Sequence, residues 1–342
     1  MLYARALGVD AAELFSDDFD GGGASGSERC ADEVVAGLPA LSSAQFGELM
    51  EHLREQWHSL VKLDNLLGPR YTLASVRTQI SLLETLLGPT RGKDRADVLR
   101  LAAQYAESAA WLYEDAGEID QAQRWTDRAT VWASEIDDHL MLAWTMFRRS
   151  QLAVAEGHAG NAIGLAGAAG RLSMELPAPM RAAIVQQQAQ GYALDAEEVR
   201  CQTLLDEAQT WAASVSDDGD ARSGHGSFCT HAYIEIQRAH CWFRLKQPAR
   251  AIAVYQTALP ALPQVYLRDR GMAIARLAEA YAVAREPEQA AVTANEALGI
   301  AQGTGSTRIL KVVGSVDRTL GFYRSLPAVA DLHTALTEPS TV

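Results

Sequence analysis

The chain has 342 residues, of which 48% are hydrophobic and 21% are charged, a composition typical of folded globular proteins. Its 43 acidic and 30 basic residues give a net charge of −13, which argues against a surface devoted to nucleic acid, although a local basic patch remains open. Four scattered cysteines do not form a disulfide framework, and no apolar stretch approaches the roughly 20 residues of a membrane span. We therefore expect a cytoplasmic protein without membrane contact.

The first forty residues differ in character from the rest of the chain. Residues 1–15 predict two short helices that are too short to bury a core by themselves. Residues 16–42 begin with a run rich in Gly, Ser and Asp, which predicts a flexible linker, and end in a short helix. Residues 43–337 form the main predicted domain, and residues 338–342 form a tail.

Nearly everything after residue 43 has helical periodicity. Apolar residues recur at steps of three and four, and Gly or Pro residues separate the periodic segments. No segment alternates β-branched and polar residues as a strand would. The sequence predicts an all-α chain with helices near 43–67 and 71–88 at one end and near 306–323 and 328–337 at the other.

Between these ends, a pattern of small and aromatic residues repeats five times. The first two copies share mutual spacings of 3, 4, 5 and 7 residues, and successive copies are 39 or 40 residues apart, except for one step of 50 that contains an insert at 216–227. The matching positions are Ala110, Tyr113, Gly117, Ala122 and Ala129; Ser150, Ala153, Gly157, Ala162 and Ala169; Ala189, Tyr192, Ala196, Cys201 and Ala208; Ala239, Trp242, Lys246, Ala251 and Ala258; and Ala278, Tyr281, Arg285, Ala290 and Ala297.

Helix-hairpin packing explains this pattern. Small residues in both helices let the antiparallel backbones approach closely, an aromatic residue fills the space beside them, and the residue between the helices turns the chain. This is the tetratricopeptide pattern, whose usual period is about 34 residues, so the helices here are longer than the standard ones. We predict a tetratricopeptide-like right-handed superhelix of antiparallel helix hairpins, with a generic helical bundle as the alternative, and expect the insert at 216–227 to be mobile.

Two segments carry a resemblance to a known family. Residues 61–87, VKLDNLLGPRYTLASVRTQISLLETLL, and residues 102–129, AAQYAESAAWLYEDAGEIDQAQRWTDRA, resemble the C-terminal sensor region of actinobacterial XRE-type helix-turn-helix transcriptional regulators. Residues 4–15 are similar to the last helices of that family's DNA-binding domain, so we expect residues 1–15 to be its remnant, with the recognition helix missing. The resemblance implies a regulatory role, with DNA as a partner only if a helix-turn-helix domain precedes this chain.

The first helix of each hairpin lines the concave side of such a superhelix, and its inward positions are the candidate binding residues. Aromatic and amide side chains there suit an extended peptide, because amides bond its backbone and aromatic rings supply contact area. We expect Trp111 and Trp144 to be partly exposed in this groove; the alternative is that they and Phe147 pack between hairpins. The predicted groove residues are Gln104, Glu107, Trp111, Glu114, Trp144, Phe147, Gln151, Gln186, Gln190, Tyr233, His240, Arg244 and Glu279.

The sequence offers little for catalysis or metal binding. The densest group of potential ligands is His225, Cys229, His231, His240 and Cys241, but Cys229 and His240 would lie about 16 Å apart along one helix, farther than one zinc ion can bridge. We therefore expect no cofactor, no metal and no enzymatic activity.

These observations leave two functions open. The first is a regulatory or sensor protein, related to transcriptional regulators, that binds a peptide, a small effector or a partner protein in its groove. The second is a protein–protein interaction scaffold with no role in transcription. A homodimer is compatible with either function.

Overall fold

The computed structural model describes residues 41–172, 175–212 and 224–337. The predicted helix-turn-helix remnant at 1–15, nearly all of the linker, the tail and residues 216–223 of the insert lie outside these ranges. Every regular element in the described part is helical, and none of its helices combines the length and apolar character that a bilayer crossing needs.

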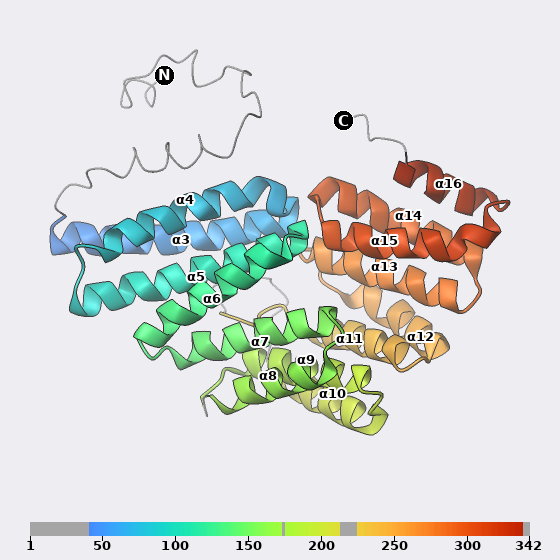
Figure 1. The fold of residues 1–342 in the computed structure, drawn as a ribbon, viewed down its shortest axis with the longest axis horizontal. Coiled ribbons are helices and arrows are strands. Elements are labelled where there is room, and N and C mark those ends of the chain that lie inside the picture. The colour runs from blue at the N-terminus through green and yellow to red at the C-terminus, as the bar shows by residue number, and fades with distance from the viewer. Residues whose placement is uncertain (1–40, 173–174, 213–223, 338–342) are drawn as a thin grey trace, which may run out of the picture. The chain divides into compact units, whose positions relative to one another are not determined.

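The helices pair into antiparallel hairpins that follow one another along the chain from α3 to α16 (Figure 1). The first four hairpins comprise α3 (Ser43–Leu67) and α4 (Pro69–Leu87), α5 (Gly92–Ala116) and α6 (Ile119–Glu135), α7 (His139–Ala155) and α8 (Ala159–Arg171), and α9 (Ala178–Leu194) and α10 (Glu198–Ala212). The remaining three comprise α11 (His231–Arg244) and α12 (Pro248–Ala258), α13 (Leu267–Val283) and α14 (Pro287–Thr304), and α15 (Thr307–Thr319) and α16 (Pro327–Thr337), with short 3-10 helices at η3 (Leu259–Ala261) and η4 (Leu320–Tyr323).

The five repeats coincide with the five hairpins from α5–α6 to α13–α14, which confirms the tetratricopeptide-like superhelix predicted from the sequence. The small residues that define each repeat lie at the contact between its two helices and are buried; Ala122, Ala162, Cys201, Ala251 and Ala290 are each at most 1% exposed. In the α7–α8 hairpin the Ser150 hydroxyl also donates to the Ala162 carbonyl oxygen across this contact, at 2.8 Å.

The turn residue of each repeat has a left-handed backbone conformation. In all five turns the next backbone N–H donates to the carbonyl oxygen five positions earlier, at 2.8–3.0 Å, which ends the first helix in a Schellman motif. Only two of the five are glycine, although glycine is the residue that adopts positive φ without strain. The turn residues are Gly117 (φ 85°), Gly157 (φ 80°), Ala196 (φ 59°), Lys246 (φ 62°) and Arg285 (φ 64°).

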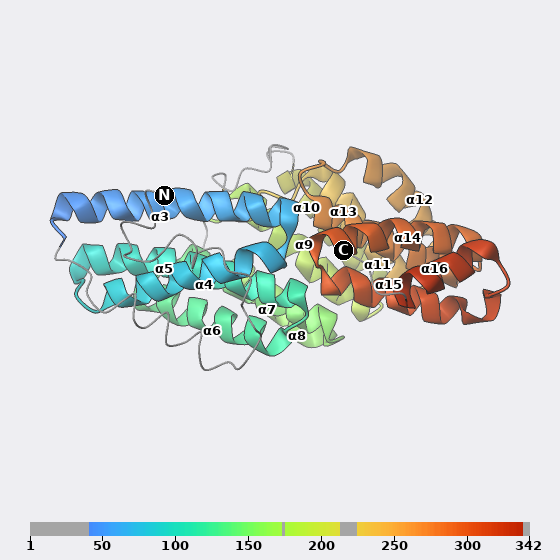
Figure 2. The same ribbon diagram turned by 90° about the horizontal axis from the view of Figure 1, so that it is seen from above.

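The first two hairpins contact the last two, so the array closes between residues that are far apart in sequence. Helix α3 contacts α13 and α14, and α5 contacts α15 (Figures 1 and 2). Gly68, between α3 and α4, has φ 79° and lies so close to the end of α14 that a Cβ atom would be 2.1 Å from the Thr304 carbonyl oxygen. Both the backbone angle and this close approach therefore require glycine at position 68.

We predict that Arg285→Gly stabilises the protein by about 0.5–1 kcal/mol, because it relieves positive-φ strain at an exposed turn. Ala284→Gly is the matched control: Ala284 has φ −73°, so glycine there adds only unfolded-state entropy and should destabilise by a similar amount. Urea unfolding of both variants measures the two effects. Equal and unfavourable changes at both positions would contradict the assignment of strain to residue 285.

Candidate functional site

A cavity of about 180 Å³ lies where the first helices of several hairpins converge. Its walls come from α3, α5, α7, α11 and α13, with one residue from α4 and the segment 224–228. The wall is mainly aromatic, with charged groups along one side. The aromatic side chains are Trp57, Trp111, Trp144, Phe147, His225, Phe228, Tyr233 and Tyr266, and the charged ones are Asp64, Glu107, Arg148, Arg268 and Asp269.

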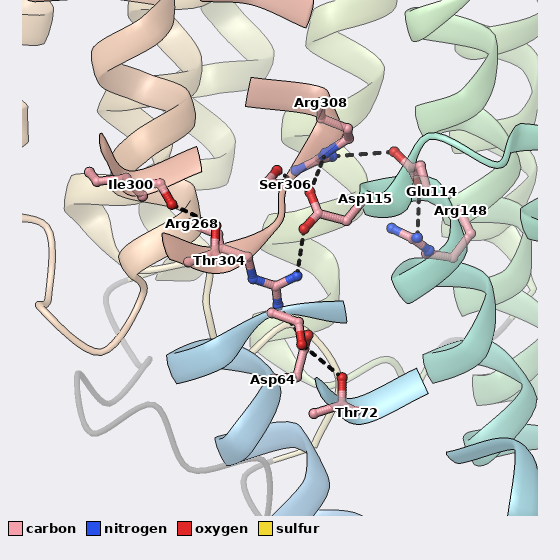
Figure 3. Close-up of polar contacts among 11 residues, drawn as sticks. Asp64, Thr72, Glu114, Asp115, Arg148, Arg268, Ile300, Thr304, Ser306 and Arg308 are labelled. Atoms are coloured by element: carbon pink, nitrogen blue, oxygen red, sulfur yellow. Dashed lines mark hydrogen bonds and ion pairs between the residues drawn. The ribbon is translucent and has the colours of Figure 1, made fainter. Parts of the chain in front are cut away.

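A buried group of charged residues joins the two ends of the array beside this cavity (Figure 3). We call it the clasp and define it as Asp64, Glu114, Asp115, Arg148, Arg268, Ser306 and Arg308. Four of its members belong to helices α3, α5 and α7, and the other three belong to helix α13 and the start of α15. The clasp therefore connects parts of the chain that are about two hundred residues apart.

Asp115 is the centre of the clasp and is fully buried. Its carboxylate accepts hydrogen bonds from Arg268 Nη1 at 2.9 Å, from Ser306 Oγ at 2.7 Å and from Arg308 Nε at 3.1 Å. Burial alone would raise the pKa of Asp115, but the charges of Arg308 and Arg268, together with these hydrogen bonds, hold it below its usual value. Asp115 is consequently ionised at neutral pH.

The remaining pairs extend the clasp on both sides of Asp115. Glu114 accepts from Arg148 Nη2 at 2.8 Å and from Arg308 Nη1 at 3.3 Å. Arg268 Nη2 donates to Asp64 Oδ2, whose second oxygen is buried without a partner. Burial raises the pKa of Asp64 to about 6, with a further contribution from the negative charge of Asp115 and a partial offset from Arg268.

The indole of Trp111 lies among the three arginines of the clasp. The guanidinium carbons of Arg308, Arg148 and Arg268 are 4.5, 4.9 and 5.5 Å from its ring centroid, all within the range of cation–π attraction. Trp111 also lines the cavity and is partly exposed, as the sequence predicted. It therefore connects the clasp to the cavity wall.

The prediction that Trp144 is partly exposed is wrong, because this side chain is only 4% exposed. Its indole stacks on Phe147 at 4.4 Å and on His225 at 4.9 Å between ring centroids, and its Nε1 donates to Glu107 at 3.0 Å. Burial lowers the pKa of His225, so that imidazole is neutral. The end of the 216–227 insert thus covers Trp144, which sequence periodicity could not indicate.

The structure divides the thirteen predicted groove residues into separate groups. Six of them line the cavity: Glu107, Trp111, Trp144, Phe147, Gln151 and Tyr233. Glu114 belongs to the clasp, and Gln104 lines a smaller hollow between α3 and α5.

The other five predicted residues lie on α9, α11 and α13, away from the cavity wall. Gln186 and Gln190 are buried; Gln190 Nε2 donates to Gln237 Oε1 at 2.8 Å and so joins α9 to α11, whereas Gln186 bonds within α9. Their predicted place on an open groove is wrong, because both side chains are buried and bond to α9 or α11. His240 is buried and accepts from Arg244 Nε at 2.9 Å, and Glu279 is partly exposed on α13.

Sequence analysis missed the residues that come together only in the folded chain. Asp64, Asp115, Arg268 and Arg308 lie at helix ends in four different helices, and Asp269 follows Arg268. The one available signal is that Asp115 interrupts an otherwise apolar helix face. The described residues contain no set of three His, Cys, Asp or Glu side chains placed to hold a metal ion.

Comparison with known proteins supports the fold. No protein-family model matches the chain, and no curated protein matches it in sequence. Among solved structures, it is similar to the crystal structure of a Rap protein complexed with competence and sporulation factor, with a TM-score of 0.50 and 13% sequence identity. The match covers 84% of this chain and 96% of the Rap chain. At this identity the likeness concerns the fold, which defines the chain as a tetratricopeptide-like helical-repeat protein.

We predict that Asp115→Asn destabilises the protein by about 3 kcal/mol, because it leaves the buried Arg268 and the partly buried Arg308 without their shared anion. The matched control is Glu84→Gln, which removes a solvent-exposed pair with Arg128 and should change stability by less than about 0.5 kcal/mol. Chemical denaturation at neutral pH measures both. Equal effects of the two substitutions would contradict a structural role for the clasp.

The raised pKa of Asp64 predicts a specific dependence of stability on pH. A carboxyl that protonates near pH 6 when folded, but near 3.8 when unfolded, adds stability as the pH falls from about 6 towards 4. The stability difference between wild type and Asp64→Asn should therefore grow by about 1 kcal/mol in favour of wild type from pH 7.5 to pH 5. A difference that stays constant across this interval would mean that Asp64 does not titrate there.

Proposed function

We propose that this chain is a regulatory sensor that binds a peptide, a small effector or a partner protein at the cavity on its inner wall. The observation that carries the proposal is the position of the cavity beside the clasp. Asp64, Arg148 and Arg268 belong both to the clasp and to the cavity wall. A ligand in the cavity therefore contacts the residues that hold the two ends of the array together.

This geometry provides a route from binding to regulation. In a repeat array each hairpin contacts mainly its neighbours, so a change at one interface is transmitted along the stack. A ligand that binds better when the clasp is closed than when it is open shifts the population towards the closed form. A partner that recognises one of these forms then responds to the ligand.

The comparison supports a sensor of this kind. The Rap protein of the same fold is complexed with competence and sporulation factor. The resemblance of residues 61–87 and 102–129 to XRE-type regulators favours a role in controlling transcription, which we include in the proposal together with a cytoplasmic location. The charged groups of the clasp are bonded to one another, an arrangement that favours binding over catalysis.

A second candidate function is a scaffold that recruits a protein without an effector. The observation that favours it is Phe322 in η4, whose side chain is 98% exposed near the end of the array. Together with the exposed Tyr323 it offers an apolar contact surface that is not part of the cavity wall. A scaffold of this type would bind its partner whether or not the cavity is filled.

We predict that Val61→Trp, which places a large side chain into the cavity wall, abolishes ligand binding. The matched control is Val131→Trp, because Val131 is 60% exposed on α6 and does not line the cavity. Each protein is incubated with the low-mass fraction of a cell extract of the source organism, and native mass spectrometry identifies any bound molecule.

Wild type and Val131→Trp should retain the same small molecule or peptide, and Val61→Trp should retain none. A molecule retained equally by all three proteins would contradict the cavity as the binding site. If no small molecule or peptide binds, and all three proteins capture the same protein partner, the scaffold is the correct function.

A further inference from the structure

One charged group on the cavity wall has no partner among the residues that the structure describes. Three carboxylates line the cavity, those of Asp64, Glu107 and Asp269, and two guanidinium groups face them, those of Arg148 and Arg268. Both arginines are already engaged: Arg268 with Asp64 and Asp115, and Arg148 with Glu107 and Glu114. Among the charged lining residues, Asp269 alone takes part in no hydrogen bond or ion pair between described residues.

The surroundings of Asp269 make this isolation costly. Burial raises the pKa of its carboxyl, and the more distant charges of Arg308 and Arg268 offset that effect only in part. The carboxylate is partly exposed and lies in the first turn of α13, where the helix N-terminus favours a negative charge, but no hydrogen bond from a described residue replaces the hydration that it loses. A ligand that brings a positively charged donor to Asp269 would recover this loss.

The other residues of the cavity wall indicate what kind of molecule should carry this positively charged donor. Trp57, Phe228, Tyr233 and Tyr266 line the same cavity, and aromatic rings attract both apolar groups and cations. The volume of about 180 Å³ is slightly larger than a cavity of roughly 150 Å³ that holds one benzene molecule. The enclosed part of the ligand is therefore about one aromatic ring with a short chain.

We propose that the cavity selects a ligand with a primary ammonium group on a short apolar or aromatic body, and that Asp269 is the residue that binds the ammonium. Two sources share this chemistry: a free arylalkylamine, and the first residue of a peptide with a free N-terminus. The inference rests on the proposed function, because it names the kind of ligand that the same cavity receives.

Two probes of equal size and opposite charge test the choice of ligand. 2-Phenylethylamine and 3-phenylpropionate share a phenyl ring and a two-carbon chain, but one ends in an ammonium and the other in a carboxylate. We expect wild type to bind the amine at least about tenfold more tightly, by isothermal titration calorimetry, since charge-assisted hydrogen bonds contribute that much or more. Equal affinities, tighter binding of the acid, or no binding of the amine would overturn the proposal.

Two substitutions test the residue. Asp269→Asn should weaken binding of the amine roughly 10- to 100-fold, whereas Asp331→Asn, the same change at an exposed position on α16, should leave it unaltered. Because Asp269 is unpaired, its replacement should not lower the unfolding midpoint, and Asp269→Ser provides a second variant in case the asparagine protein fails to fold. Unchanged affinity for the amine in a folded Asp269 variant would refute the assignment.

The tripeptide Phe-Ala-Ala, with free or acetylated N-terminus, separates the two sources. Tighter binding of the free tripeptide than of 2-phenylethylamine identifies a peptide as the ligand, and weaker binding identifies a free amine. Acetylation should abolish binding in the first case, and equal binding of the acetylated form would overturn the proposal. If these probes fail to bind as expected, the ammonium-selective ligand is refuted but the proposed function is not. An uncharged or anionic ligand would still bind wild type and would still be lost in Val61→Trp.

Discussion

The buried carboxylate of Asp115 is the constraint on which the inner wall depends. It accepts hydrogen bonds from two arginines and one serine that lie more than 150 residues later in the chain. An ionised carboxylate without donors is very costly to bury. The fold tolerates Asp115 because it positions all three of these donors within hydrogen-bond distance. The clasp therefore specifies how the first three hairpins meet the last two, in addition to whatever it contributes to stability. An open array of the same hairpins would leave these charges in water.

Closure also produces the cavity. The side chains of α3, α5 and α7 meet those of α13 only because the array closes, and the resulting space has aromatic groups on most sides and the clasp on one. Trp111 belongs to both structures and lies among three guanidinium groups. Ligand binding and closure of the array are consequently coupled, and this coupling is the physical basis for a sensor.

Much of the fold was predictable because helical hairpins depend on local information. The repeating small residues mark where two backbones approach, and Gly117, Gly157, Ala196, Lys246 and Arg285 mark the turns, all of which adopt positive φ. The groove was predicted less well. Periodicity indicates which side chains face inward but not what faces them, so Gln186 and Gln190, which are buried and bond to α9 and α11, were expected on an open surface.

By itself, the sequence determined that this chain is all-α, that it consists of stacked hairpins, and where each hairpin turns, because these properties follow from neighbours within about forty residues. Only the tertiary structure decided that Asp64 and Asp115 meet Arg268 and Arg308, that His225 covers Trp144, and that Asp269 has no partner among the described residues. Those relations depend on the small rotations between successive hairpins, which accumulate along the array and have no signature in any single repeat.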